Sequence, residues 1–285
     1  MSKLKLLSLL TFSLLFCDDN EGYVFELNLT NDFYFNMESV VNVSSGSFEY
    51  QQLFSARILH EFEKPNTSSG EMKMIQSFEN VISSDRRNDE MRPNHEAQKL
   101  TGTSYTITID SLGYVESTEG NSDLAKQVLD ESEEVNWLFG VNQERGNIKY
   151  FMGEGLRRNV GDVWSISDTT LNPPGTYGFD KFNGTVITYS DYSFKKIKKK
   201  RGDVIAVVKC KTGMQVKGIG STWDQTVDFS QVGEFICTIT FNITKGLIVS
   251  NRVDGTMNIL GIDLGDDSSF SAQIGVALKQ KGKLK

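Results

Sequence analysis

The chain has 285 residues, of which 38% are hydrophobic and 24% are charged, and it carries a formal net charge of −7. This composition is that of a folded globular protein, and the length allows one large domain or two small ones. The acidic balance argues against general binding to nucleic acid. Beyond the N-terminus, no apolar stretch approaches the roughly 20 residues of a membrane-spanning helix.

The N-terminus is typical of a signal peptide. Lys3 and Lys5 supply positive charge around an apolar stretch that runs from Leu4 to Phe16. The stretch is too short to span a membrane as a helix, and it lacks the polar face of a soluble helix. We therefore predict a signal peptide over residues 1–16 and export from the cytoplasm.

Cys17 ends this apolar stretch, and an acidic run follows it. No Ala-x-Ala-like pair offers an ordinary cleavage site, and Leu14-Leu15-Phe16-Cys17 resembles a bacterial lipobox, except that a small residue is expected before the cysteine. We predict that Cys17 carries a lipid, that residues 17–22 form a tether and that residues 23–285 form a single β-rich domain. The lipid would hold the protein at the outer membrane of a bacterial cell envelope, and the alternative is secretion.

The two other cysteines, Cys210 and Cys237, each lie on the apolar side of a predicted strand. In an oxidising compartment they can form a disulfide, although two buried thiols fit the pattern equally well. Neither belongs to a Cys-x-x-Cys motif, so redox chemistry and structural zinc are not indicated.

Most of the mature chain alternates apolar and polar residues with a period of two, as half-buried strands do. In the clearest run, Phe270, Ala272, Ile274, Val276 and Leu278 face one way. Further strands are predicted over residues 23–29, 33–43, 72–82, 105–109, 148–152, 163–166, 185–194, 204–210, 214–219, 235–241, 247–253 and 256–260. This pattern predicts a large sheet with one apolar face and one wet face.

Short polar segments separate these strands. Gly202-Asp203, Lys245-Gly246 and Asp254-Gly255 predict turns, and Asp-Gly is a strong hairpin signal. Residues 64–70 and 85–99 are rich in polar or charged side chains and are predicted to be mobile loops.

One segment, from Asn121 to Glu144, breaks the strand pattern and predicts a helix. Its apolar stripe includes Leu124 and Val128, and the apolar face of the sheet is the available packing partner. We expect Leu124, Val128 and Trp137 to line any pocket between helix and sheet, and the alternative for Trp137 is simply to fill the core.

The segments Val160-Gly161-Asp162-Val163-Trp164, Gly233–Asn242 and Gly246–Ser250 resemble a family of uncharacterised bacterial lipoproteins, classed as a domain of unknown function. The resemblance covers about residues 22–280. By fold analogy, such chains are similar to the half-barrels of periplasmic lipoprotein carriers, in which a curved sheet wraps a helix and can hold acyl chains. The resemblance therefore implies a mainly β fold: a large curved antiparallel sheet, or half-barrel, with one inserted helix packed on its apolar face.

Signatures of catalysis are few. The chain has two histidines, His60 and His95, and no Gly-x-Ser-x-Gly motif, which argues against a serine triad. A pair of carboxylates that hydrolyses glycosides needs only to meet in space, so a secreted hydrolase remains an alternative. The acidic turn at Asp263, Asp266 and Asp267 lacks the ligand spacing of an EF-hand. We predict no cofactor and no metal.

A basic cluster stands out in this acidic protein. It consists of Lys195, Lys196, Lys198, Lys199, Lys200 and Arg201. Such a cluster can attract anionic lipid headgroups or polysaccharide, and the alternative is a solvated hairpin end.

The hypothesis that unites these features is a non-catalytic envelope lipoprotein that binds an apolar ligand, such as an acyl chain, or serves as a scaffold. Its expected partner is the membrane, through the lipid at Cys17, and no nucleic acid is expected. A structural or adhesive surface protein is a further alternative.

Overall fold

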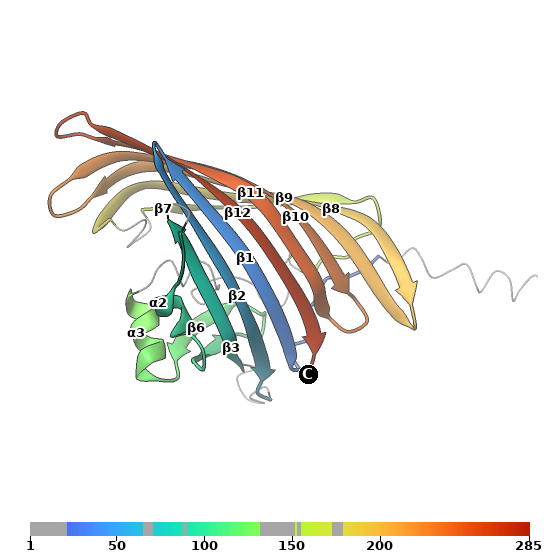
Figure 1. The fold of residues 1–285 in the computed structure, drawn as a ribbon. Helices are drawn as coiled ribbons and strands as arrows, with labels where there is room; N and C mark the ends of the chain where they lie inside the picture. The colour runs from blue at the N-terminus through green and yellow to red at the C-terminus, as the bar shows by residue number, and fades with distance from the viewer. Residues whose placement is uncertain (1–21, 65–70, 88–89, 132–151, 153–154, 173–178) are drawn as a thin grey trace, which may run out of the picture.

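A computed structural model describes residues 22–64, 71–87, 90–131, 152, 155–172 and 179–285. Within them, twelve strands form one sheet, with two short helices beside it (Figure 1). The strands are β1 (Phe33–Ser45), β2 (Phe48–Phe62), β3 (Met72–Arg87), β4 (Glu90–Pro93), β5 (Ser104–Ile109), β6 (Val115–Gly120), β7 (Val163–Leu171), β8 (Lys181–Lys200), β9 (Asp203–Ser221), β10 (Thr226–Asn242), β11 (Leu247–Asp263) and β12 (Ser269–Leu284). The helices are α2 (His95–Gln98) and α3 (Asp123–Glu131).

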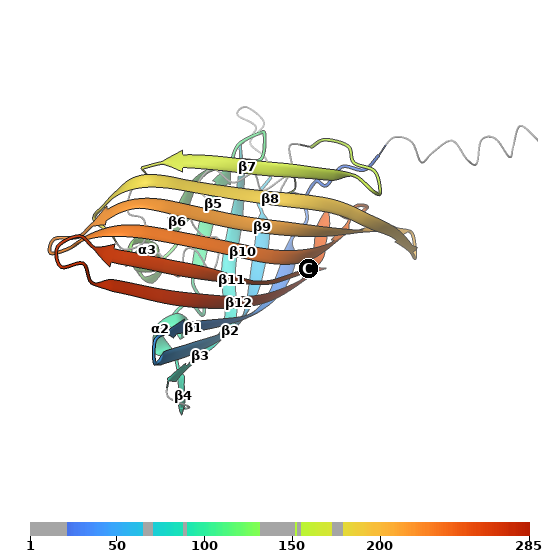
Figure 2. The same cartoon turned by 90° about the horizontal axis from the view of Figure 1, so that it is seen from above.

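The sheet is open and antiparallel. Its strand order is β6-β5-β3-β2-β1-β12-β11-β10-β9-β8-β7, with β4 paired to β3, so β6 and β7 form the two edges. Figure 1 shows the sheet arching over α2 and α3, and Figure 2 shows strands β7 to β12 side by side across one broad surface. The predicted fold class, a large curved antiparallel sheet with an inserted helix, is confirmed.

The concave face of the sheet carries the core because apolar residues alternate along the strands. On β9 and β10, Ala206, Val208, Ile239 and Phe241 are buried on this face, as the alternation predicts. The N-terminal segment 23–32 crosses these strands, and its Phe25, Leu27 and Leu29 are buried in the same cluster. A strand is predicted over residues 23–29, but their main-chain contacts are a single bridge between Tyr23 and Arg158 and one hydrogen bond from Asn28 to Gly246.

A second core cluster lies under β1, β2, β3 and β5. It contains Phe54, Phe78, Tyr105 and Leu100, together with Ala125 of α3, which is fully buried. The helix therefore packs on the apolar face, as predicted, but through Ala125. Leu124 remains 37% exposed. The described helix ends at Glu131, and the rest of the predicted helix lies outside the described residues.

The hairpin predicted at Asp254-Gly255 is wrong. Strand β11 runs through both residues, which pair with Ile236 and Phe235 of β10 on one side and with β12 on the other. A Cβ on Gly255 would lie 2.3 Å from the carbonyl oxygen of Glu234 and 2.5 Å from the Phe235 ring. The glycine therefore makes room for a neighbouring strand and its aromatic ring, and it does not mark a turn.

The loop predicted over residues 85–99 is also replaced by regular structure where the chain is described. Strand β3 continues to Arg87, and β4 and α2 follow it. The Asn94 side chain begins α2 by accepting a hydrogen bond from the backbone N–H of Ala97 at 3.0 Å, and it donates to Asp85. Capping and strand pairing thus give order to a charged segment that has little apolar periodicity.

Candidate functional site

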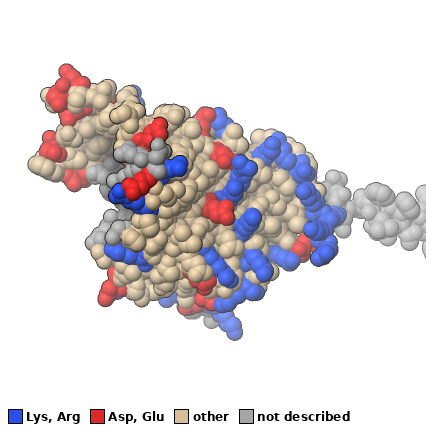
Figure 3. Space-filling view, viewed as in Figure 1, with Lys and Arg blue, Asp and Glu red and all other residues tan. Residues whose placement is uncertain are grey.

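The convex face of the sheet carries a concentration of lysines near one end of the long strands. Because side chains alternate across a strand, every second residue of β8, β9 and β12 points to this face. The exposed residues in question are Lys196, Lys198, Lys200, Lys209, Lys279, Lys281 and Lys283, and we call them the lysine field. Figure 3 shows Lys and Arg side chains gathered on this part of the molecule.

The strand register aligns the basic residues in a row across the sheet. Lys209 pairs with Thr238, Thr238 with Arg252, and Arg252 with Lys279. Neighbouring strands are about 4.8 Å apart, so three cations lie on four consecutive strands. The partner of Lys279 on β1 is Glu38.

Some basic residues of this face are neutralised by ion pairs, and the lysine field is not. Lys211 contacts Glu234 at 2.9 Å, and the hydrogen bond between them lowers the pKa of that carboxyl. Arg252 contacts Asp254 at 2.7 Å. Among the described residues, no ion pair involves any of the seven lysines of the field. Their positive charge is therefore available to an external anion.

The β8–β9 hairpin places three of these lysines at the end of the sheet. Lys200 pairs with Asp203, so the two turn residues are Arg201 and Gly202, with φ values of 52° and 85°. Positive φ at both central residues is the signature of a type I′ turn, which suits the twist of long antiparallel strands. The turn was predicted one residue later.

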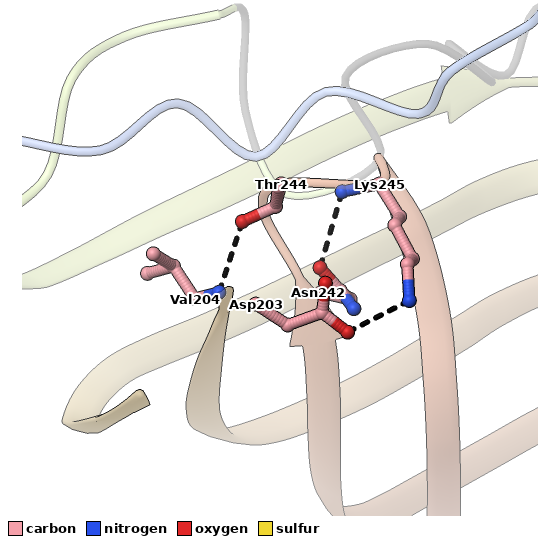
Figure 4. A network of polar contacts seen from close by, with 5 residues as sticks. All are labelled: Asp203, Val204, Asn242, Thr244 and Lys245. Atoms are coloured by element: carbon pink, nitrogen blue, oxygen red, sulfur yellow. Dashed lines mark hydrogen bonds and ion pairs between the residues drawn. The ribbon is translucent and has the colours of Figure 1, made fainter. Parts of the chain in front are cut away.

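A polar network fixes this hairpin to its neighbours (Figure 4). Lys245 Nζ contacts Asp203 Oδ2 at 2.7 Å, and this contact lowers the pKa of the Asp203 carboxyl. The backbone N–H of Val204 donates to Thr244 Oγ1 at 2.9 Å, and that of Lys245 donates to Asn242 Oδ1. The base of the basic hairpin is thus bonded to the β10–β11 turn, so the lysines stand on a rigid support.

The described N-terminus lies at the same end of the sheet. The backbone N–H of Tyr23 donates to the Arg158 carbonyl at 2.7 Å, and the Tyr23 ring lies 6.0 Å from the ring of Phe194 on β8. Further along, the N–H of Asn28 donates to the carbonyl of Gly246 in the β10–β11 turn. The first described residues therefore lie against β8, the strand that leads into the basic hairpin.

The predicted cysteine pair lies in the core. Cys210 and Cys237 are direct partners on β9 and β10, both side chains are buried, and the structure joins them in a disulfide with a Cα–Cα distance of 4.9 Å. That distance is within the usual range for disulfides. The cross-link closes a loop of 27 residues in the part of the sheet that supports the lysine field.

The predicted lipidation site and most of the predicted ligand-facing set are not among the described residues. Cys17 and Trp137 lie outside the described residues, and the side chain of Val128 does too. Of the predicted basic cluster, Lys196, Lys198 and Lys200 face outward, and the irregularity between Phe194 and Lys196 places Lys195 at a bulge. Sequence reasoning missed Lys279, Lys281 and Lys283, although their spacing of two residues was a usable signal.

The described residues offer no assembled catalytic centre. His60 lies against the rings of Phe33 and Phe35, and burial lowers its pKa to about 3. His95 lies on the surface in α2. No group of three or more His, Cys, Asp or Glu side chains in the described residues could hold a metal ion. In the acidic turn, one oxygen of Asp263 and one of Asp266 accept backbone hydrogen bonds that shape the turn.

A shallow depression of about 430 Å³ lies on the convex face, away from the lysine field. Hydroxyl and amide side chains such as Ser230, Asn258 and Gln273 line it, together with Val232 and Leu260. No ionisable side chain takes part, so the depression offers hydrogen bonds and aliphatic contact only.

No protein-family model matches the chain, and no curated protein matches it in sequence. Among solved structures, a DUF1329 family protein from Desulfovibrio piger is 9% identical over 87% of this chain and 85% of its own, with a TM-score of 0.19. OmpF of Salmonella typhi in complex with daunomycin is 8% identical over 90% of this chain and 99% of its own, with a TM-score of 0.23. The first of these belongs to a domain family of unknown function, and likenesses this low assign neither a family nor a function. No helix among the described residues has the length and apolar character needed to cross a membrane.

Proposed function

We propose that the protein is a non-catalytic module of the bacterial cell envelope that binds an anionic membrane surface through its lysine field, with a lipid on Cys17 as the second attachment. The observation that carries the proposal is the set of seven lysines on one face of the sheet, none of which forms an ion pair within the part of the chain that the structure describes. In an acidic protein, such local concentration of positive charge is a recognition feature for anions.

The position of the N-terminus supports the pairing of the two attachments. Gly22 lies five positions after Cys17, and an extended chain spans at most about 3.5 Å per residue, so the lipid would lie within about 17 Å of Gly22. Gly22 adjoins Arg158 beside β8. A lipid there brings the basic hairpin to the headgroups.

The energetics explain why two attachments are needed. A single acyl chain gives marginal, reversible membrane binding, and stable attachment takes a second signal such as a basic patch. Each lysine near an anionic surface contributes up to about 1 kcal/mol. The lysine field therefore supplies an affinity comparable to that of the lipid, and it also sets which face of the sheet lies on the membrane.

The test separates the surface from the lipid by using the full chain with Cys17→Ser. Vesicles of phosphatidylcholine with one quarter phosphatidylglycerol should bind this protein in a sedimentation assay, and pure phosphatidylcholine vesicles should not. The triple variant Lys279→Gln, Lys281→Gln, Lys283→Gln should weaken binding by about tenfold to a hundredfold, because it removes up to about 3 kcal/mol of attraction.

The matched control is Arg86→Gln, Lys126→Gln, Lys217→Gln, which removes the same charge from exposed sites outside the field. It should bind nearly as well as the parent at 50 mM salt, and both proteins should lose binding at 300 mM. Equal losses in the two triple variants would mean that net charge alone governs attachment, and the proposed site would be wrong.

A further inference from the structure

The end of the long strands opposite the lysine field presents acidic and apolar side chains. Two hairpin turns meet there, β9–β10 and β11–β12, at the left of Figure 1. Their residues Trp223, Asp224, Asp263, Leu264, Asp266 and Asp267 form what we call the hairpin tip surface. The backbone N–H of Leu264 donates to the Thr226 carbonyl at 2.8 Å, so the turns lie side by side.

Trp223 is the feature that requires an explanation. It is 90% exposed, and Leu264 in the adjacent turn is 51% exposed. A tryptophan gains more from burial than almost any other side chain, and exposed tryptophans are enriched among residues that dominate protein interfaces. A solvated turn would be equally well served by a polar residue at this position.

The tip surface is rigid, because each turn is closed by its own hydrogen bonds. In the first turn, the Thr222 hydroxyl donates to Asp224 Oδ1 at 2.8 Å and accepts from the backbone N–H of Gln225 at 3.2 Å. The backbone N–H of Thr222 donates to the Gln225 carbonyl at 2.9 Å. In the second turn the N–H of Asp267 donates to the Asp263 carbonyl at 3.0 Å. Trp223 and Leu264 are therefore presented in fixed positions, which lowers the entropy lost when a partner binds.

The charge of this end identifies the chemistry of the partner. No lysine or arginine occurs between Lys217 and Lys245, or between Arg252 and Lys279, so neither hairpin carries a cation of its own, and Lys181 at the start of β8 lies opposite Ser221 beside them. The four carboxylates of the tip surface outnumber this lysine and form no ion pair among the described residues, and Figure 3 shows acidic side chains at this end and basic ones at the other. An anionic bilayer would repel such a surface, whereas a cationic one would be steered towards it.

We propose that the hairpin tip surface docks a basic protein partner that accepts the Trp223 indole in an apolar pocket ringed by lysine or arginine. A basic ring would pair with the four carboxylates and would place cations near the indole, whose face attracts them. The apolar Val232 and Leu260, 50% and 44% exposed beside the depression on the convex face, extend the contact area.

The geometry makes this surface independent of the lysine field. Strand β10 has 17 residues, so about 55 Å separates the hairpin tips from the far end of the sheet. A molecule held at its basic end could engage a partner at its acidic end at the same time. The two proposals can therefore fail separately.

The experiment measures fluorescence anisotropy of a labelled 14-residue peptide of alternating lysine and leucine with the purified full chain at 50 mM salt. A glutamate–leucine peptide of the same length is the charge control. We expect binding of the lysine peptide, a loss of at least tenfold with Trp223→Ala, and a weaker salt dependence when Asp224, Asp263, Asp266 and Asp267 are changed to asparagine. Asparagine keeps the side-chain oxygen that closes each turn, so these variants should fold.

The matched control is Ile236→Ala, which removes an apolar side chain that is 66% exposed on the convex face. It should leave peptide affinity unchanged, and Trp223→Ala should leave binding to phosphatidylglycerol vesicles unchanged. Unaltered peptide affinity in Trp223→Ala, or equal binding of the glutamate peptide, would overturn the proposal. So would Trp223-dependent self-association in sedimentation velocity, or Trp223-dependent binding to phosphatidylcholine vesicles, since each identifies a different occupant.

Discussion

Arg252 and Lys279 lie directly opposite each other on β11 and β12, with both side chains exposed on the convex face. Like charges in this position are destabilising, and opposite charges there would stabilise the sheet. Asp254 contacts Arg252 at 2.7 Å and relieves part of the repulsion, whereas no ion pair between described residues involves Lys279. A folded sheet gains nothing from a lysine here, which agrees with a role in binding.

Replacement of Lys279 by threonine separates stability from binding. Lys279 faces Arg252 on one side and Glu38 on the other, so its repulsion and attraction nearly cancel, and threonine favours strands. We expect Lys279→Thr to leave the free energy of unfolding unchanged or to raise it by up to about 1 kcal/mol. Affinity for phosphatidylglycerol vesicles should fall up to about fivefold. Lys217→Thr, on the same face outside the field, should change neither quantity; a clear loss of stability in Lys279→Thr would contradict the expectation.

Arg201 occupies a turn position that suits it poorly. Its φ of 52° lies in the left-handed region, which costs a non-glycine residue about 1 kcal/mol, and Asn-Gly is the preferred pair in type I′ turns. Arg201→Asn should therefore raise the free energy of unfolding in urea by roughly 0.5–1 kcal/mol. Arg201→Val should lower it by a similar amount or more. If both variants unfold at the same urea concentration as the parent, the turn is not of this type.

Gly255 on β11 and Gly275 on β12 differ in the space that each leaves for a side chain. A Cβ at Gly255 would lie 2.3 Å from the Glu234 carbonyl oxygen, which the neighbouring strand cannot move cheaply, whereas at Gly275 the nearest atom lies at 3.9 Å. Gly255→Ala should lower the free energy of unfolding by about 1–3 kcal/mol, as overpacking does. Gly275→Ala should be neutral or slightly stabilising. Equal melting temperatures for the two variants would mean that β11 does not pass this close to β10.

The sequence predicted which face of the central strands β9 and β10 is buried. On β9 and β10, Ala206, Val208, Ile239 and Phe241 are buried with the two cysteines, as the alternation predicts, whereas on β12 the predicted apolar face is only half-buried and Phe270 is 48% exposed. The length of the strands could not be predicted, because glycines within them were interpreted as turns. Gly213, for example, lies under the ring of Tyr189 from β8, and such a contact between strands leaves no trace in the local sequence.

The candidate site was predictable only in part. The run from Lys195 to Arg201 is visible in the sequence, but the lysine field also needs β12, which is about 80 residues further along the chain. Lys279 joins the field through the register of β9 to β12, and register depends on long-range pairing. Trp223 was not singled out, since a tryptophan in a strand-rich sequence is expected in the core, and only the turn geometry reveals its exposure.

The disulfide should contribute measurably to stability. Closing a loop of 27 residues is worth about 3 kcal/mol on the loop-entropy model. The double variant Cys210→Ala, Cys237→Ala should therefore unfold at lower urea concentration than the oxidised parent, by about that free energy. The parent treated with dithiothreitol should approach the double variant, and mass spectrometry of the untreated parent after alkylation should find neither cysteine modified. Full alkylation of both cysteines without reductant would show that they are thiols.

His60 should make the stability of the fold depend on pH between neutral and mildly acidic conditions. Its ring lies 4.8 Å from that of Phe33 and 5.4 Å from that of Phe35, and burial lowers its pKa from 6.5 to about 3. The folded state then keeps His60 neutral, while the unfolded chain takes up a proton as the pH falls below 6.5. The unfolded state therefore binds more protons in this range, and stability falls with the pH. From pH 7 to pH 5 the loss of unfolding free energy from this residue is up to about 2 kcal/mol, since each pKa unit corresponds to 1.36 kcal/mol.

His60→Leu should remove that part of the pH dependence in urea unfolding curves, and His95→Gln, at an exposed site, should retain it. A parent protein whose stability does not change between pH 7 and pH 5 would show that His60 is solvated in the folded state.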